Sequence, residues 1–419
     1  MRSLADWLEQ QTKSHPRSID LTLDRVRAVG RRLGLLAPAH RVITVAGTNG
    51  KGSTVTYLDA VLRAHGLRCG RFTSPHLNRY NERICIDGVE ATDAELIASF
   101  ERIEAARASD TLTFFEYNAL AALYCFQRRG VDVAVLEVGL GGRLDATNII
   151  DADVGVVCSI GIDHTEWLGD SLEGIGREKA GIFRAGRPAV LGSTQMPRSV
   201  FEVIDEIGAH ALVPGRDYFS LRREDSWDFE CGTARLRDLP LPALSGAHQL
   251  NNAATALAAI VSLPGATRLF GDSVASALRS VWLPGRFQIV PGTVEWVLDV
   301  AHNVPAAEEL RTNLRSLPRR RTFAVCGILG DKDIRGISAV LAEQIDTWIA
   351  VRLAGPRAVA TEELATRLPP GAVVAAHAQD VAQGCALAQQ MARDLATPAR
   401  VLVFGSFLTV GPALEFLEI

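Results

Sequence analysis

The sequence predicts an α/β protein with a larger and a smaller domain, and three observations support that prediction. Short runs of Val, Ile and Leu alternate with helical patterns, which is typical of a parallel sheet covered on both faces. At 419 residues, the chain is too long for one ordinary core. The run Leu283-Pro-Gly-Arg-Phe287, with Pro291 and Gly292 shortly after, separates two such series. We therefore expect domains over 1–288 and 293–419, joined by a linker over 283–292.

The expected elements of the first domain follow in chain order. Helical patterns open the chain near 3–12 and 22–34. Strands are predicted over 41–46, 67–72, 131–137, 154–160 and 188–191. Helices are predicted over 53–65, 93–107, 115–129, 171–182, 249–262 and 271–281. Between 210 and 242 the runs are short and mixed, which predicts a small antiparallel excursion from a mostly parallel sheet.

The second domain repeats the alternation on a smaller scale, as in a Rossmann-like α/β fold. Strands are predicted over 294–300, 321–327, 346–351, 372–375 and 400–404. Helices are predicted over 305–316, 334–344, 361–367 and 379–394. The stretch 293–419 is long enough for a small independent domain.

Composition narrows the class of protein. Lys plus Arg total 44 and Asp plus Glu total 48, a net charge of −4, so nucleic-acid binding by bulk electrostatics is not expected. No apolar run approaches the roughly 18 residues needed to cross a bilayer, and the charged start of the chain does not resemble a signal peptide. The seven widely spaced cysteines include no Cys-x-x-Cys and favour a reducing compartment. We expect a cytoplasmic protein without nucleic-acid or membrane partners.

The most informative motif follows the strand over 41–46. It reads Gly47-Thr-Asn-Gly-Lys-Gly-Ser-Thr54, a glycine-rich turn, a lysine and hydroxyl residues that open a helix. Backbone amides of such a turn converge on phosphate oxygens, and Lys51 would reach the outer phosphates. The common pattern is G-x-x-x-x-G-K-[ST]. Here Gly47 lies only three residues before Gly50, and Gly52 separates Lys51 from Ser53. The motif still predicts a P-loop ATPase-like first domain.

Polar residues follow other predicted strands of the same sheet. Glu137 ends the strand over 131–137, where a Mg²⁺-coordinating carboxylate would sit beside a phosphate loop. The glycines after it do not fit G-x-G-x-x-G, so no dinucleotide fingerprint is predicted. A lone histidine is usually structural, but His164 follows the strand over 154–160 in the same sheet as Glu137, and that position strengthens the case for a ligand. On spacing alone, Ser74 is better explained as a turn-forming hydroxyl before proline.

Taken together, the motifs resemble one known family. They are, in order, Gly47–Thr54, Ser74-Pro-His-Leu77, Phe115-Glu-Tyr117, Leu136–Asn148, Asp163-His164, Gly176–Phe183, Leu283–Phe287 and Asp299-Val-Ala-His-Asn303. This order resembles the bacterial folylpolyglutamate synthase/dihydrofolate synthases of the Mur ligase superfamily, from about residue 20 to Gly405-Ser-Phe407. The Gly-Lys-Gly-Ser order is the family's own form of the phosphate loop.

The resemblance implies an activity and its small-molecule partners. An ATP-dependent ligase would join L-glutamate to 7,8-dihydropteroate or to reduced folates such as tetrahydrofolate. ATP is the co-substrate, one or two Mg²⁺ ions assist, an acyl phosphate is the intermediate, and a monomer is implied. The 293–419 domain would be the glutamate ligase domain.

The resemblance also implies roles for individual residues. ATP would be bound by Thr48, Asn49, Gly50, Lys51, Gly52, Ser53, Asn252, Arg286, Asp299 and His302. Metal ligands would be Ser74, Glu137 and His164. The pteroate would contact Asp20, Leu21, Thr22, Leu23, Thr113, Phe114, Phe115, Glu116 and Leu144. The catalytic set would be Lys51, Glu137, His164 and Lys179, and Lys179 matches a lysine that is carbamylated in relatives. From the residues alone, Lys179 would be an ordinary surface lysine.

Three alternatives stay open at this point. A monofunctional enzyme would make only dihydrofolate or only extend folates. A cell-wall Mur ligase would share the phosphate loop, but the loop begins at Gly47 and leaves no room for a separate N-terminal UDP-sugar domain. A nucleotide-dependent switch is disfavoured because the chain has no Asn-Lys-x-Asp guanine-reading motif.

Overall fold

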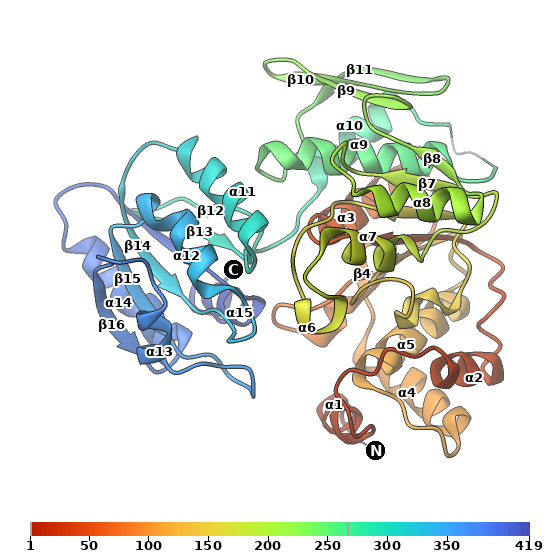
Figure 1. Ribbon diagram of the computed structural model, residues 1–419, viewed down its shortest axis with the longest axis horizontal. Coiled ribbons are helices and arrows are strands. Elements are labelled where there is room, and N and C mark those ends of the chain that lie inside the picture. The colour runs from red at the N-terminus through yellow and green to blue at the C-terminus, as the bar shows by residue number, and fades with distance from the viewer. Residues whose placement is uncertain (1, 266–267) are drawn as a thin grey trace. The chain divides into compact units, whose positions relative to one another are not determined.

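The computed structural model describes residues 2–265 and 268–419, and the chain divides into two compact units (Figure 1). The first unit comprises the residues up to Gly161 together with Leu168–Ala243 and Gln249–Val281. The second comprises Ile162–Trp167, Leu244–His248 and Trp282–Ile419. Two short stretches from the middle of the chain therefore belong to the second unit.

The first unit is built on an eight-stranded sheet with the order β4-β3-β2-β5-β1-β6-β7-β8. Its strands are β1 (Arg41–Ala46), β2 (Cys69–Phe72), β3 (Ile84–Ile86), β4 (Val89–Glu90), β5 (Val133–Glu137), β6 (Val154–Val157), β7 (Pro188–Leu191) and β8 (His210–Leu212). The six strands from β2 to β8 are parallel, and β3 and β4 form an antiparallel edge. The mostly parallel sheet was expected, whereas the β3–β4 edge was not.

Helices cover this sheet, because a parallel strand can expose neither face to water. They are α1 (Leu4–Lys13), α2 (Asp24–Arg32), α3 (Lys51–Ala64), α4 (Asp93–Arg107), α5 (Phe114–Arg129), α6 (Thr165–Leu168), α7 (Leu172–Ala180), α8 (Arg198–Ile207), α9 (Ala247–Val261) and α10 (Gly271–Ser280). Short 3₁₀ turns, η1 (Tyr80–Arg83) and η2 (Ala146–Ile149), complete the set. α6 and the start of α9 include residues of the second unit.

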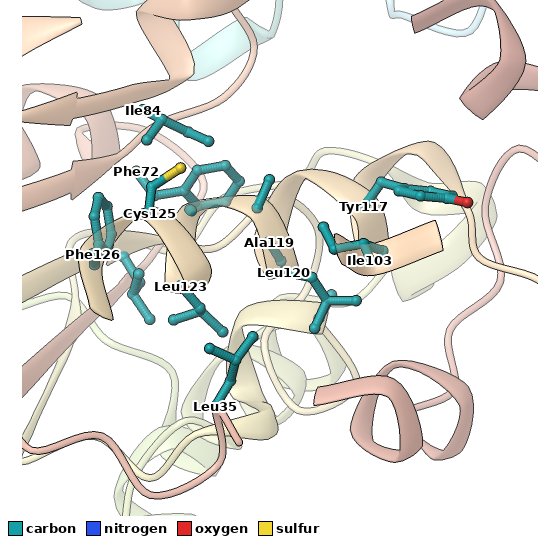
Figure 2. Close-up of a cluster of buried hydrophobic side chains, with 14 of the residues drawn as sticks. Leu35, Phe72, Ile84, Ile103, Tyr117, Ala119, Leu120, Leu123, Cys125 and Phe126 are labelled. Carbon is teal, nitrogen blue, oxygen red and sulfur yellow. The ribbon is translucent and has the colours of Figure 1, made fainter. Parts of the chain in front are cut away.

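The core beneath β2 and β5 is organised around α5. Figure 2 shows Leu120, Leu123 and Phe126 of α5 among Phe72, Ile84 and Ile103, and all six side chains are buried. At the edge of this cluster, the Tyr117 hydroxyl donates a hydrogen bond to Glu104 Oε2 at 2.7 Å. The aromatic first turn of α5 is thereby anchored on α4, and this anchoring places the segment around Thr113.

The antiparallel excursion predicted over 210–242 is a three-stranded sheet with the order β11-β10-β9. Its strands are β9 (Tyr218–Arg222), β10 (Ser226–Cys231) and β11 (Ala234–Pro240), and β11 packs against α10 (Figure 1). The excursion begins later than expected, because His210–Leu212 pairs in parallel with β7 and extends the large sheet.

The second unit contains a six-stranded sheet with the order β12-β13-β17-β14-β15-β16. Its strands are β12 (Gln288–Val290), β13 (Val294–Asp299), β14 (Arg321–Cys326), β15 (Thr347–Val351), β16 (Val374–Ala378) and β17 (Ala399–Phe404). Its helices are α11 (Val304–Arg315), α12 (Ile334–Leu341), α13 (Thr361–Thr366), α14 (Val381–Arg393) and α15 (Phe407–Phe416), with a 3₁₀ turn η3 (Ala342–Gln344). All strands except β12 run parallel, as in a Rossmann-like domain.

Besides β3, β4, α6 and the 3₁₀ turns η1 and η2, three further elements were not among the expected ones. β12 lies inside the predicted linker and pairs antiparallel with β13. α8 follows Pro197 directly, and α15 contains Pro412. Neither helix was predicted, because proline locally indicates the interruption of a helix. Across the described part of the chain, no helix is long and apolar enough to span a membrane.

Candidate active site

The phosphate loop leaves the carboxyl end of β1 and enters α3 at Lys51. Gly50 is the N-terminal cap of that helix, with a left-handed backbone (φ +85°) that favours glycine. A Cβ atom at Gly50 would lie 2.7 Å from Asn252 Oδ1, so a side chain there would also collide with α9. The sequence folds into this turn because glycine alone meets both conditions.

The segment after β6 holds the loop from the other side. The Thr48 amide donates to the Ser159 carbonyl at 2.8 Å, and the Asn49 amide donates to Ser159 Oγ at 3.1 Å. Thr48 Oγ1 in turn donates to the Gly161 carbonyl at 3.0 Å. These bonds fix the loop backbone before any ligand arrives, which lowers the entropic cost of binding an anion.

Lys51 and the hydroxyl residues occupy the start of α3. Lys51 Nζ donates to the carbonyls of Gly47 and Thr48 at 3.0 and 3.2 Å, so its ammonium lies over the loop. Ser53 Oγ accepts a hydrogen bond from Gln249 Nε2 at 3.3 Å, and Asn252 Nδ2 donates to Gln249 Oε1 at 3.1 Å. Predicted residues Ser53 and Asn252 are therefore linked through Gln249, which the sequence did not single out. Gly52, between Lys51 and Ser53 in the chain, accepts a hydrogen bond at its carbonyl from Thr56 Oγ1 at 2.8 Å.

Glu137 ends β5, which lies between β1 and β2 in the sheet. Its side chain is 5% exposed, and its Oε2 accepts a hydrogen bond from the Ser74 amide at 3.3 Å. Two of the three predicted metal ligands are thus neighbours at the carboxyl edge that also carries the phosphate loop. On spacing alone, Ser74 is interpreted as a turn-forming residue. That interpretation does not include the contact seen here, in which the Ser74 amide donates to the buried Glu137 carboxylate.

Lys179 is 6% exposed and lies near the end of α7. The interpretation of this residue as an ordinary surface lysine is therefore wrong. Long cationic side chains are seldom buried to this degree without a specific partner. The segment after β5 lies against this end of α7, since the Arg143 amide donates to the carbonyl of Glu178, the residue before Lys179, at 2.9 Å.

The polar residues of the predicted pteroate set meet around Arg25 of α2. Arg25 Nη1 donates to Thr22 Oγ1 at 2.8 Å, and its Nη2 donates to Glu116 Oε1 at 3.1 Å. Arg25 also pairs with Asp20 Oδ2 at 3.3 Å. Thr113 caps α5 reciprocally with Glu116, whose Oε2 accepts from the Thr113 amide at 2.7 Å. Segments about ninety residues apart in the chain are thereby joined.

The apolar members of that set line the same region of the first unit. The Phe115 ring lies against Gly139, where a Cβ atom would come within 2.4 Å of the ring. Phe115 also packs on Phe72 with a centroid distance of 5.9 Å, and Phe114 stands edge-on to Tyr80 at 6.1 Å. Leu144 packs against the core around α5, Leu23 is buried at the start of α2, and Leu21 is half-buried.

His164 belongs to the second unit, in the stretch Ile162–Trp167. Its neighbour Asp163 accepts hydrogen bonds from Lys332 Nζ and from Asn303 Nδ2, the latter at 3.0 Å. His302 Nε2 lies 3.7 Å from Asp163 Oδ2. Burial raises the pKa of the Asp163 carboxyl, but Lys332 and both histidines outweigh it and hold that pKa below its ordinary value.

Arg286 and Asp299 also lie in the second unit. Asp299 ends β13 and accepts from the backbone amides of Phe287 and Ala301, both at 2.8 Å. Burial raises its pKa, and Arg286 opposes that rise. The Arg286 guanidinium stacks 4.9 Å from the centroid of the Phe407 ring. Asp299 therefore shapes the backbone that carries Arg286.

The first unit thus assembles the phosphate loop, Ser74, Glu137, Lys179, Asn252 and the pteroate set, and the second carries His164, Arg286, Asp299 and His302. Residues 2–265 and 268–419 contain no group of three or more His, Cys, Asp or Glu side chains that could hold a metal ion. Sequence reasoning missed Ser159, Gln249, Arg25, Asn303 and Lys332. Lys332 follows the strand over 321–327 closely, so the strand-end rule applied to Glu137 could have found it.

Known proteins resemble this chain in both of its units. Residues 45–196 match the Mur ligase middle domain, and residues 285–407 match the Mur ligase, glutamate ligase domain. A dihydrofolate synthase/folylpolyglutamate synthase from Escherichia coli is 45% identical over 418 residues, which cover 99% of this chain and 96% of the relative. The chain belongs to the dihydrofolate synthase/folylpolyglutamate synthase family.

Other members of the dihydrofolate synthase/folylpolyglutamate synthase family are similar over their full length. A Haemophilus influenzae member is 39% identical, with 99% of this chain and 98% of the relative covered. Escherichia coli FolC in complex with DHPP and ADP has a TM-score of 0.93 and 44% identity, covering 100% of this chain and 98% of that one. A bifunctional member with Mn, AMPPNP and L-glutamate bound has a TM-score of 0.91 and 43% identity, covering 100% and 99%.

Proposed function

We propose that this protein is an ATP-dependent ligase that joins L-glutamate to 7,8-dihydropteroate, giving dihydrofolate, and to tetrahydrofolate, giving folylpolyglutamates. The observation that carries the proposal is the preformed phosphate loop around Lys51 with the buried Glu137 carboxylate at the end of a neighbouring strand. Full-length relatives named for both activities support it.

The chemistry explains why such a site is needed. A carboxylate is a poor electrophile, because an amine cannot expel oxide from it. Transfer of the γ-phosphoryl group of ATP to the pteroate or folate carboxylate gives an acyl phosphate, and the glutamate amine then displaces phosphate. In phosphoryl transfer, the protein mainly positions the reactants and stabilises charge. Lys51 supplies positive charge where the γ-phosphate and the incoming carboxylate repel each other.

The nucleotide is held by the residues proposed from the sequence. Thr48, Asn49, Gly50, Gly52 and Ser53 present loop and helix amides to the phosphates, and Lys51 adds its ammonium. Asn252 stands beside the turn at Gly50. In the second unit, Arg286, Asp299 and His302 complete the ATP set, and Asp299 orders the backbone next to Arg286.

Ser74, Glu137 and His164 hold Mg²⁺, as one or two ions. Hydroxyl and carboxylate oxygens are ligands that Mg²⁺ prefers, and the buried Glu137 beside the Ser74 amide fits that use. A relative with bound Mn and AMPPNP supports a divalent metal alongside nucleotide. An ion held by these residues would neutralise phosphate charge. Lys179 is buried, and its carbonyl lies against Gly142, shortly after β5. In this proposal Lys179 is carbamylated, which would convert a cation into an oxygen ligand.

The pteroate portion binds to Asp20–Leu23, Thr113–Glu116 and Leu144, where aromatic rings meet a polar cluster built on Arg25. The first domain is the ATP-binding catalytic domain, and the 293–419 domain orders glutamate. The enzyme acts as a cytoplasmic monomer on small molecules alone. The complex of Escherichia coli FolC with DHPP and ADP supports the binding of a second small molecule beside the nucleotide.

The test measures ADP release by the purified protein with Mg-ATP and L-glutamate. Dihydropteroate and tetrahydrofolate are added in separate reactions, and products are identified by mass. Glutamylation of both substrates is expected. Glutamylation of only one would make the enzyme monofunctional, and ATP turnover without any glutamylated product would contradict the proposal.

A further inference from the structure

The proposed pteroate site comprises two segments, Asp20–Leu23 and Thr113–Glu116. Among the polar contacts described above, only those of Arg25 join the two. Its guanidinium donates to Thr22 Oγ1 and to the Asp20 carbonyl on one side, at 2.8 and 3.4 Å. On the other side it donates to Glu116 Oε1 at 3.1 Å, across 91 positions of the chain. None of these partners belongs to the proposed nucleotide or metal set.

The electrostatics make this contact hard to replace. Glu116 is 3% exposed, and its Oε2 is occupied by the Thr113 amide at the cap of α5. Burial raises the pKa of Glu116, whereas the Thr113 amide and Arg25 oppose that rise. Without the guanidinium, a buried carboxyl at the start of α5 would lose the cation that offsets its burial. It would then take up a proton or shift toward water.

The segment Asp20–Leu23 depends on the same side chain. It is a tight turn, in which the Thr22 amide donates to the Asp20 carbonyl at 3.0 Å, and it leads directly into α2. Arg25 is the second residue of α2, and its side chain folds back onto the turn over Asp20–Leu23. That side chain is only 21% exposed. His15, 3.6 Å from Asp20 Oδ2, is the weaker remaining anchor. Removing Arg25 would therefore release the turn from α5.

We propose that Arg25 is a positioning residue for the pteridine half of the substrate. It holds Asp20–Leu23 against the first turn of α5, so that both segments present their backbone and side-chain groups to dihydropteroate and to tetrahydrofolate. This inference rests on the proposed function. The pteridine is remote from the reacting carboxylate, so removing Arg25 weakens binding of the substrate and of the transition state equally. Loss of Arg25 raises KM for the pteridine substrates and leaves kcat nearly unchanged.

The test compares Arg25→Met with wild type by steady-state kinetics and by calorimetric titration of dihydropteroate. Loss of several charge-assisted hydrogen bonds should raise Kd and KM for dihydropteroate and tetrahydrofolate by roughly tenfold or more. KM for ATP should stay within about twofold, since no nucleotide residue is touched. Arg25→Lys keeps the charge without the planar fork and should restore binding only in part.

Arg32→Met is the matched control. Arg32 lies on the same helix and also donates across the unit, to the carbonyls of Ala106 and Arg107 at 3.0 and 3.1 Å. It contacts no proposed pteroate residue, so its loss should leave both pteridine affinities unchanged. If Arg25→Met lowers the yield of folded protein, Arg25→Lys, which keeps the charge but loses the planar fork, carries the comparison and should raise Kd in the same direction.

The outcomes separate the inference from the function it rests on. Wild-type protein that binds neither dihydropteroate nor tetrahydrofolate would overturn both. Wild-type binding with unchanged affinity in folded Arg25→Met, or an equal rise in KM for ATP, would overturn the role of Arg25 and leave the ligase proposal standing. A pteridine-specific rise that Arg32→Met does not share supports the inference.

Discussion

Lys332 Nζ donates to Asp163 Oδ1 across 169 positions of the chain, and both side chains are less than a tenth exposed. Asn303 donates to the other oxygen of the same carboxylate at 3.0 Å. The pair holds the stretch Ile162–Trp167 in the second unit and fixes the residue before His164.

Lys332→Met should destabilise the protein by about 3–5 kcal/mol, because it leaves a buried carboxylate without its cation. The control, Arg319→Met, breaks the exposed pair with Asp346 and should cost at most about 1 kcal/mol. Urea-unfolding midpoints measure both. Equal midpoints for the two variants would contradict the structural role of the pair.

Lys51→Ala should lower turnover by several orders of magnitude and leave folding unchanged. Lys51 Nζ bonds only the loop carbonyls of Gly47 and Thr48 among its described hydrogen bonds, so the fold loses little. ADP release and circular dichroism together measure the effect. A folded variant with normal turnover would remove the phosphate-loop assignment.

Gly50→Ala should abolish nucleotide binding. The substitution combines left-handed backbone strain of roughly 1–2 kcal/mol with a collision at Asn252. Gly66→Ala is the matched control, since Gly66 has a similar φ of +76° and a Cβ atom there would meet nothing within 4 Å. Calorimetry with AMPPNP should show binding by the Gly66 variant alone; comparable binding by both would show that the contact with Asn252 is unimportant.

Glu137→Ala and His164→Ala should each raise the Mg²⁺ concentration needed for half-maximal turnover, because each would remove one ligand. Glu309→Gln, which alters the contact with His248, is a control outside the metal set. The measurement is ADP release across a magnesium titration. Unchanged dependence in both ligand variants would dispose of the metal site.

Glu104 predicts a defined pH dependence of stability. Its hydrogen bonds from Arg107, and then from Tyr117, hold its folded-state pKa below the ordinary 4.5. A depressed carboxyl pKa adds stability that is complete above the unfolded value and disappears as pH falls through the folded value. The melting temperatures of wild type and Glu104→Gln should therefore differ near neutral pH and converge on acidification. A constant difference at all pH values would contradict this account.

The strand ends could be predicted because they depend on local signals. Glu137 and the loop after β1 follow uninterrupted apolar runs, and in a parallel sheet such ends meet at one edge. The helix after the loop begins at Lys51, earlier than expected, because the left-handed Gly50 already completes the turn.

Other features depend on contacts that local patterns do not carry. Arg25 appears in the sequence as one arginine among several on an amphipathic helix, and nothing nearby marks Glu116 as its partner. β12 forms inside a proline- and glycine-rich stretch because β13 offers a free edge. Burial of Lys179 likewise follows from packing of α7, which charge alone does not predict.

The three separate stretches of the second unit limit how the protein can be cut or recombined. A fragment starting at Trp282 would leave Lys332 without Asp163 and Glu309 without His248. Exchanging this region between relatives at one splice point would consequently pair a foreign lysine with a native aspartate. A functional chimaera should therefore need Ile162–Trp167 and Leu244–His248 from the same relative that supplies Trp282–Ile419. The second unit can be exchanged only together with these two stretches, which lie far upstream in the sequence.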